Sequence, residues 1–152
     1  MKWSIIAVGK PALAWAKEGV ADYLGRLQRT HRVECLFLRE GTQDQVAKRV
    51  LEASEGSLRV LLDERGSLQR STELAAWIGK KELGGCKHVS ILIGGANGHP
   101  PAVRLAAQES WSLSPFTLQH ELALVVLLEQ LYRAGCIMRG DPYHREGSLG
   151  RS

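Results

Sequence analysis

Nearly continuous apolar stretches recur along this chain of 152 residues, and more polar segments separate them. Apolar side chains on both faces of a strand are typical of a parallel sheet that helices cover on both sides. Stretches of this kind lie at residues 3–9, 33–38, 58–63 and 88–94. We therefore predict four buried strands, the third of which ends at Asp63 and is followed by a turn over 64–67.

The segments between these strands carry apolar residues three and four positions apart, which is the spacing of one helix face. Ser71 or Thr72 can cap such a helix, and Gly84 can end it. The helices predicted in this way are 12–28, 44–55 and 71–83. This alternation predicts one α/β domain over 1–152, with a mostly parallel sheet and helices on both faces.

The part of the chain after the fourth strand is the most informative. A glycine-rich loop, GGANGHPP, precedes a second short apolar run, WSLSPFTL, and a long apolar helix that ends in LLEQLYRA. Ligands of parallel α/β sheets bind beyond the carboxyl ends of the strands. That rule singles out the loops 62–66, 94–98 and 113–118, and we expect them to face one crevice. The glycines alone also fit a plain strand-to-helix connection.

Composition permits several functions and selects none. Hydrophobic residues make up 44% of the chain and charged residues 24%, as in ordinary soluble proteins. The net charge of +4, from 20 Lys and Arg against 16 Asp and Glu, is spread along the chain without a basic arm. Binding to nucleic acid is therefore allowed by charge but not demonstrated by it.

The cysteines and the first residues indicate a cytoplasmic protein. Cys35, Cys86 and Cys136 form no CxxC pair, and their odd number argues against a disulfide framework. The apolar start is interrupted at residues 9–11, whereas the core of a secretory signal is continuous. No apolar run approaches the length that spans a bilayer, so we expect no membrane partner.

Common catalytic motifs are missing from the sequence. GGANG departs from the dinucleotide fingerprint GxGxxG at Ala96, and no phosphate-binding GxxxxGK[ST] occurs. The five histidines lack metal-ligand spacing, so we expect no metal site. No GxSxG elbow is present, which argues against the common hydrolases.

The last helix carries a polar group on an otherwise apolar surface. Glu129, Tyr132 and Arg133 share one face because they are three and four positions apart. The preceding run LALVVLL is apolar nearly all round, which predicts burial in the core or against a second subunit. Whether the Glu129–Arg133 pair is structural or contacts substrate stays open. The polar tail PYHR is not needed for the fold, and this favours a reactive lid.

These segments together resemble a known family. The motifs IIAVGK, LLDERG, IGGANG, SWSLSPFTL, LLEQLYRA and PYHR, in this order, resemble the ribosomal RNA large subunit methyltransferase H family of the SPOUT class. The resemblance covers essentially the whole chain. Each motif is moderately specific, whereas their order, spacing and total length are highly specific.

The resemblance implies an activity that composition and periodicity do not reveal. It implies a cytoplasmic homodimer whose C-terminal part forms a trefoil knot and binds S-adenosylmethionine there. It further implies a 23S rRNA (pseudouridine-N3)-methyltransferase, which acts on a pseudouridine in helix 69 of 23S rRNA within the assembled ribosome.

The same resemblance implies the residues of the cofactor pocket. Leu62 should end its strand against the ligand, and Gly94 should let the ligand approach the backbone closely. The remaining pocket residues form one loop, namely Leu113, Ser114, Pro115, Phe116, Thr117 and Leu118.

Catalytic residues are implied in the helix and the tail. Arg133 matches the helix motif, while Tyr143, His144 and Arg145 match the terminal motif, which should cover the site and extend toward the partner subunit. His144 is the candidate general base for the imino proton, because imidazole titrates near neutral pH, and phosphate binding is its alternative role. Arg133, Arg139 and Arg145 are candidate phosphate contacts.

The chain departs from the family pattern near the start of the last helix. Gln119 and Glu121 stand where proline and glutamine are expected, and Leu124 stands near an expected arginine. The loss of that cation puts a direct RNA contact at this position in doubt but does not affect the cofactor pocket.

Two other functions stay open at this stage. A non-catalytic ribosome-binding module of the same fold would not bind the methyl donor. A nucleotide-cofactor enzyme on a doubly wound sheet would bind a dinucleotide, although the fingerprint for one is absent.

Overall fold

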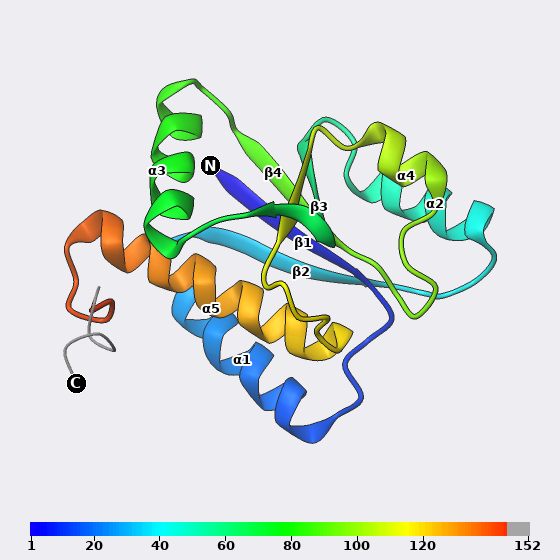
Figure 1. Cartoon of the computed structure of the whole chain (residues 1–152), viewed down its shortest axis with the longest axis horizontal. Helices are drawn as coiled ribbons and strands as arrows, with labels where there is room; N and C mark the ends of the chain where they lie inside the picture. The colour runs from blue at the N-terminus through cyan, green and yellow to red at the C-terminus, as the bar shows by residue number, and fades with distance from the viewer. Residues whose placement is uncertain (146–152) are drawn as a thin grey trace.

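A five-stranded parallel sheet forms the centre of the protein, as the computed structural model of residues 1–145 shows (Figure 1). Its strand order is β2-β1-β4-β3-β5. The strands are β1 (Lys2–Val8), β2 (Arg32–Leu38), β3 (Leu58–Leu68), β4 (His88–Ile93) and β5 (Glu109–Ser112). The helices are α1 (Ala14–Gln28), α2 (Gln43–Ala53), α3 (Ser71–Leu83), α4 (Pro101–Ala106) and α5 (His120–Arg139). The predicted α/β class is confirmed.

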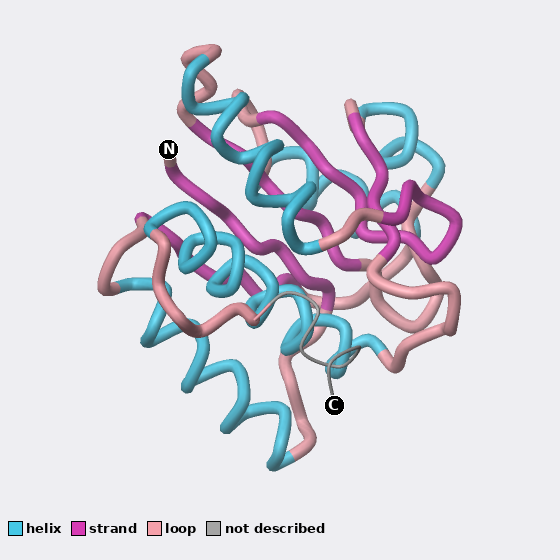
Figure 2. The backbone as a smooth tube through the Cα atoms, turned by 60° about the vertical axis from the view of Figure 1, so that its left-hand side comes forward, coloured by secondary structure: helices cyan, strands magenta, loops and turns pink. Residues whose placement is uncertain are grey.

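Helices cover both faces of the sheet, which explains why its strands are apolar throughout. Figures 1 and 2 show α1, α3 and α5 on one face and α2 with α4 on the other. Alternate residues of one strand enter different cores: Ile5 packs under α1, α3 and α5, whereas Ile6 packs under α2 and α4. Among residues 1–145, no helix combines the length and the apolarity needed to cross a membrane.

Helix α5 is the central helix of the larger core. Its buried residues Leu124, Leu127, Leu128 and Leu131 recur at helical spacing and face the sheet. Leu124, one of the departures from the family pattern, is only 3% exposed, so it serves apolar packing in this chain.

Glu121, another departure, fastens the start of α1 to the start of α5. Its carboxylate accepts the backbone N–H groups of Ala12 at 2.6 Å and Leu13 at 3.0 Å. The hydrogen bond from Leu13 and that from Ala12 lower the pKa of Glu121, so the group is ionised near neutral pH. This carboxylate therefore joins two segments that are far apart in the sequence.

The predicted end of the third strand is wrong. Strand β3 continues through the expected turn to Leu68, and its register against β5 shifts between Leu62 and Ser67. Pairing resumes because Gly66 has no side chain: a Cβ there would lie 2.6 Å from the carbonyl carbon of Trp111. The run WSLSPFTL also divides, because only its first two residues belong to β5 and the rest form a loop.

The start of α3 also differs from the prediction. The helix begins at Ser71, but Arg70 occupies the N-cap position, and its backbone N–H donates to the Glu73 carboxylate at 2.9 Å. The Ser71 hydroxyl is engaged elsewhere, since it donates to the side-chain oxygen of Gln130 on α5 at 2.6 Å. The predicted caps Ser71 and Thr72 are therefore wrong.

Replacement of Gly66 tests the close contact between β3 and β5. Gly66→Ala should lower the free energy of unfolding by about 1–3 kcal/mol, because the added methyl forces the two strands apart. Gly25→Ala is the matched control: no atom lies within 4 Å of a Cβ at this helical position. It should raise the free energy of unfolding by about 0.5–1 kcal/mol. Urea titration measures both, and equal effects would contradict the close contact.

Candidate functional site

A cleft of about 410 Å³ lies at the carboxyl ends of β4 and β5 and at the register shift in the middle of β3. The three segments singled out from the sequence meet there as expected, although residues 62–66 belong to β3 and do not form a loop. The predicted cofactor residues that line it are Leu62, Gly94, Leu113, Ser114, Phe116, Thr117 and Leu118. Pro115 is absent from the described lining. The structure thus brings the predicted residues together, while their binding of a cofactor stays a prediction.

The glycine loop is closed by its own packing. The Gly98 N–H donates to the Gly95 carbonyl at 3.0 Å, and Gly98 adopts a left-handed φ of +74°. A Cβ on Gly94 would lie 3.0 Å from the carbonyl carbon of Gly98. The tight connection therefore requires Gly94 in its own right, and the same residue forms part of the cleft wall.

An ion pair holds one side of the cleft. The largely buried Asp63 carboxylate pairs with Arg104 of α4 and accepts the Arg65 backbone N–H at 3.0 Å. Burial opposes the charged form, but the hydrogen bond from Arg65 and the pairing with Arg104 outweigh it and lower the pKa of Asp63 to about 2. Asp63 consequently stays ionised beside Leu62 at physiological pH, and the Arg104 guanidinium balances its charge.

Two side-chain hydrogen bonds connect the three segments. His99, just after the glycine loop, lies with Nε2 3.0 Å from the Leu62 carbonyl oxygen. Burial lowers the pKa of His99, so the ring is neutral at pH 7 and donates through Nε2–H. The hydroxyl of Thr117 donates to the Glu64 carboxylate and so joins the loop 113–118 to the middle of β3. These contacts fix the walls of the cleft relative to one another.

The cleft suits a ligand of the size and character of S-adenosylmethionine. Its volume lies within the roughly 300–1,000 Å³ of small-molecule sites. Leu62, Leu113 and Leu118 supply apolar surface for a ring system, while Asp63 and Glu64 supply carboxylates for hydroxyl or cationic groups. Phe116 is 82% exposed at the cleft and is free to cover a bound ligand. In the described part of the chain, no His, Cys, Asp and Glu side chains gather as a metal site.

A second cavity, of about 640 Å³, adjoins the cleft. It lies between the start of α3, the end of β5, the middle of α5 and the tail, and Ser112 and Leu113 line both cavities. The predicted residues Arg133, His144 and Arg145 line this second cavity. Arg139 lines neither, and it forms an ion pair with Asp141 at 3.0 Å.

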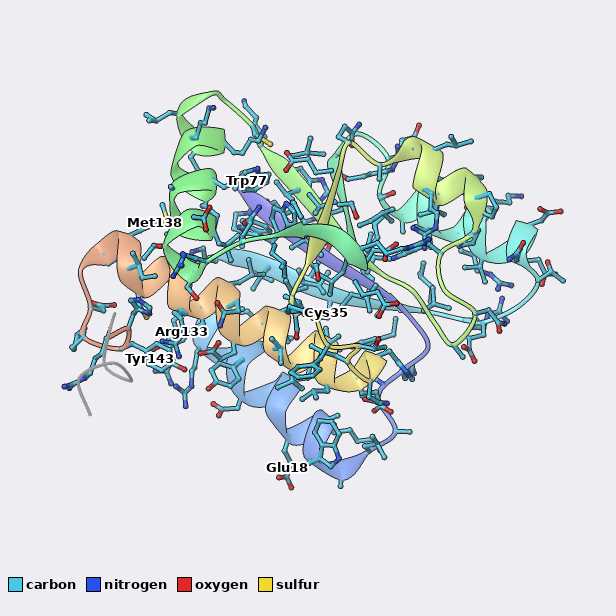
Figure 3. All side chains as sticks on the ribbon, in the orientation of Figure 1. Glu18, Cys35, Trp77, Arg133, Met138 and Tyr143 are labelled. Carbon is cyan, nitrogen blue, oxygen red and sulfur yellow. The ribbon has the colours of Figure 1, made fainter. Side chains whose placement is uncertain are left out.

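Tyr143 holds the tail against α1 and α5 of the same chain. Its hydroxyl donates to Glu129 at 3.0 Å and lies 3.1 Å from the Tyr23 hydroxyl. Its ring packs edge-on against Tyr132, and the Arg133 guanidinium lies 4.8 Å from the ring centre (Figure 3). Burial raises the pKa of Tyr143, and the hydrogen bonds with Tyr23 and Glu129 act in the same direction. Tyr143 is therefore a neutral anchor of the tail.

The hydrogen bonding of His144 defines which ring nitrogen carries the proton. A guanidinium nitrogen of Arg133 lies 3.1 Å from Nδ1, and because guanidinium only donates, Nδ1 is the acceptor. A neutral ring then carries its proton on Nε2. This Nε2 is buried and has no hydrogen-bond partner within residues 1–145. His144 therefore presents an unused N–H donor.

Several residues of these cavities were not identified from the sequence. His99, Arg104 and Glu64 lie in or beside the predicted loops, but their partners come from other segments. Arg70 lines the second cavity from the N-cap of α3. A cation at this position is unusual, since N-caps favour Ser, Thr, Asp and Asn. No signal in the sequence marks it, because the pattern favours Ser71 or Thr72 as the cap and only the structure places Arg70 there.

Comparison with known proteins agrees with the resemblance. The family model described as "Predicted SPOUT methyltransferase" matches residues 1–144. A protein named Ribosomal RNA large subunit methyltransferase H from Thermus thermophilus is 45% identical over 149 residues, which covers 95% of this chain and 99% of that protein. A protein of the same name from Deinococcus radiodurans is 41% identical over 145 residues, with 95% and 99% covered.

Solved structures share the fold at low identity. A probable methylase family protein from Haemophilus influenzae has a TM-score of 0.54 at 11% identity and covers 95% of this chain and 70% of its own. TrmJ from Z. mobilis has a TM-score of 0.51 at 13% identity, with 97% and 74% covered. The match over 1–144 and the relatives above 40% identity lead to one conclusion: the chain belongs to the SPOUT methyltransferase family.

Proposed function

We propose that this protein uses S-adenosylmethionine to methylate N3 of a pseudouridine in helix 69 of 23S rRNA within the assembled ribosome. The observation that carries the proposal is the meeting of the β3 segment 62–65 with the loops after β4 and β5 in one cleft of about 410 Å³. Seven of the eight residues that match the family's cofactor motif line it. The relatives named Ribosomal RNA large subunit methyltransferase H support the rRNA substrate.

The residues of the cleft bind the cofactor, align it with the RNA substrate and exclude water. When bound, S-adenosylmethionine supplies a methyl group on a sulfonium, which is already a strong electrophile. The chain has mainly to hold donor and acceptor in line. Leu62 and Leu113 offer apolar surface, the backbone of 113–118 offers donors and acceptors, and Phe116 covers the entrance.

Arg133 and His144 act on the substrate from the adjoining cavity. The Arg133 guanidinium lies 2.7 Å from the Glu129 carboxylate, and it donates a hydrogen bond to Nδ1 of His144. His144 then acts as a hydrogen-bond donor through Nε2, and its base role would require the bond to Arg133 to break. The imino proton leaves to water in this arrangement.

The proposal includes the homodimer, the trefoil knot and the cytoplasmic location that the family implies. Exposed apolar side chains at the starts of α1 and α5 support a second subunit at this surface. These side chains are Leu13, Trp15 and Leu122. Their proximity follows from the bonds of Glu121 to the segment before α1.

Calorimetric titration tests the cofactor. S-adenosylmethionine should bind saturably and NADH should not. Phe116→Ala should weaken binding about tenfold, because an aromatic contact is lost while the fold is unaffected at a position 82% exposed. Leu83→Ala, at a position 93% exposed at the end of α3, should bind as the wild type does. Binding of NADH alone would overturn the proposal, and binding of neither ligand would favour a non-catalytic module.

Methylation of ribosomes tests the substrate. Incubation with S-adenosylmethionine and ribosomes that lack the mark should add one methyl group to the helix 69 pseudouridine. A methyl on N3 blocks the base-pairing edge, so reverse transcription should stop at this nucleotide. Protein-free 23S rRNA serves as the control and should stay unmodified. A methyl group detected by mass spectrometry without such a stop would refute methylation at N3.

Two substitutions of His144 separate a donor from a base. His144→Ala should lower kcat about 100-fold, with cofactor affinity unchanged, because a positioned donor is removed. His144→Gln should recover much of this loss, since the amide also donates but is not basic. Turnover at saturating cofactor and ribosomes measures both. Equal losses of kcat in the two variants would indicate that His144 acts as a general base. An unchanged kcat in both variants would remove His144 from the mechanism.

A further inference from the structure

The lining of the second cavity is positively charged, although Glu129, which is not part of the lining, pairs with Arg133. The charged residues of its lining are Arg70, Arg133 and Arg145, joined by His144. Within the described residues, no aspartate or glutamate lines it. The neighbouring cleft differs, since Asp63 and Glu64 balance Arg65 and Arg104 in its wall. The two cavities are therefore suited to ligands of different charge.

The polar groups that line the second cavity include strong hydrogen-bond donors. His144 presents a buried Nε2–H that has no partner within residues 1–145. The Arg133 guanidinium can only donate, and Glu129 fixes its orientation at 2.7 Å. A buried donor without a partner is costly, so an acceptor from a ligand would restore the missing hydrogen bond. Guanidinium groups suit phosphate oxygens because they donate in a planar fork.

Arg70 is not explained by the stability of the fold. It stands at the N-cap of α3, where the partial positive charge of the helix disfavours a cation. The usual capping side chains accept a hydrogen bond, and arginine cannot. Arg70 is exposed and lines the same cavity as Arg133. The bond from Ser71 to Gln130 at 2.6 Å holds the start of α3 against α5, which keeps the two sides of the cavity together.

We infer that this cavity binds a phosphodiester of the RNA substrate next to the target nucleotide, with Arg70 as a contact. The inference rests on the proposed function, which supplies RNA as the substrate. It adds a binding subsite and a residue outside the segments that resemble the family. The common wall at Ser112 and Leu113 places this subsite beside the cofactor cleft.

The salt dependence of ribosome binding tests the subsite. Each phosphate contact adds about 0.7 to the slope of log affinity against log salt for single-stranded nucleic acid. Arg70→Gln should therefore flatten the slope by about 0.7 between roughly 50 and 200 mM salt and raise the Kd for unmethylated ribosomes about tenfold. The slope and the Kd of Arg70→Lys should lie between those of Arg70→Gln and the wild type, because lysine keeps the charge but loses the planar guanidinium fork. Arg39→Gln, after the edge strand β2, is the charge-matched control and should behave as the wild type does.

Three further results of these measurements would decide the inference. Equal slopes for Arg70→Gln, Arg39→Gln and the wild type would overturn the inference. Loss of S-adenosylmethionine affinity in Arg70→Gln would overturn it too, because the cavity would then belong to the cofactor. A normal urea midpoint shows that the variant is folded. If ribosomes bind with the expected slopes but are not methylated, the proposed function fails while the subsite stands.

Discussion

The parallel pairing of β3 with β4 on one side and β5 on the other is the contact on which the site depends. Parallel pairing directs all three strands toward the same edge, so the segments after β4 and β5 meet the middle of β3 there. Gly66 allows β3 to approach Trp111 and to resume pairing after the register shift. That shift places Asp63 and Glu64 between two paired stretches, where they are held at the cleft.

A single carboxylate organises the other half of the site. Oxygen Oε1 of Glu129 accepts two bonds from Arg133, at 3.0 and 2.7 Å, and one from Tyr143 at 3.0 Å. Each charge-assisted bond contributes about 1.5–3 kcal/mol when it is shielded from water. The Glu129–Arg133 pair forms in the structure, and it orients His144 through Nδ1. The Glu129 carboxylate thus holds the tail, α5 and the side chains of the second cavity in place.

The strands and the loops at their carboxyl ends could be predicted from the sequence because both follow from local pattern and strand direction. Apolar runs mark β1 and β4, and parallel pairing then decides which loops share an edge. The extension of β3 could not be predicted, because it depends on the close approach of Gly66 to another strand. Glu121 bonds to a segment far away in the chain, and Arg70 shares its cavity with residues of α5 and the tail. Such residues look like ordinary surface charges until the fold is known.

Charge decides which ligand suits which cavity. Asp63, with its pKa lowered to about 2, stays ionised at any physiological pH, and Arg65 and Arg104 balance Asp63 and Glu64 in the cleft wall, so the cleft does not repel a ligand with cationic groups. The arginines of the second cavity repel such groups and attract phosphate. Only the end of β5, at Ser112 and Leu113, belongs to both walls. A methyl donor in the cleft and an RNA strand in the second cavity would meet at the end of β5. The residues shared by the two linings therefore determine where the methyl group can be transferred.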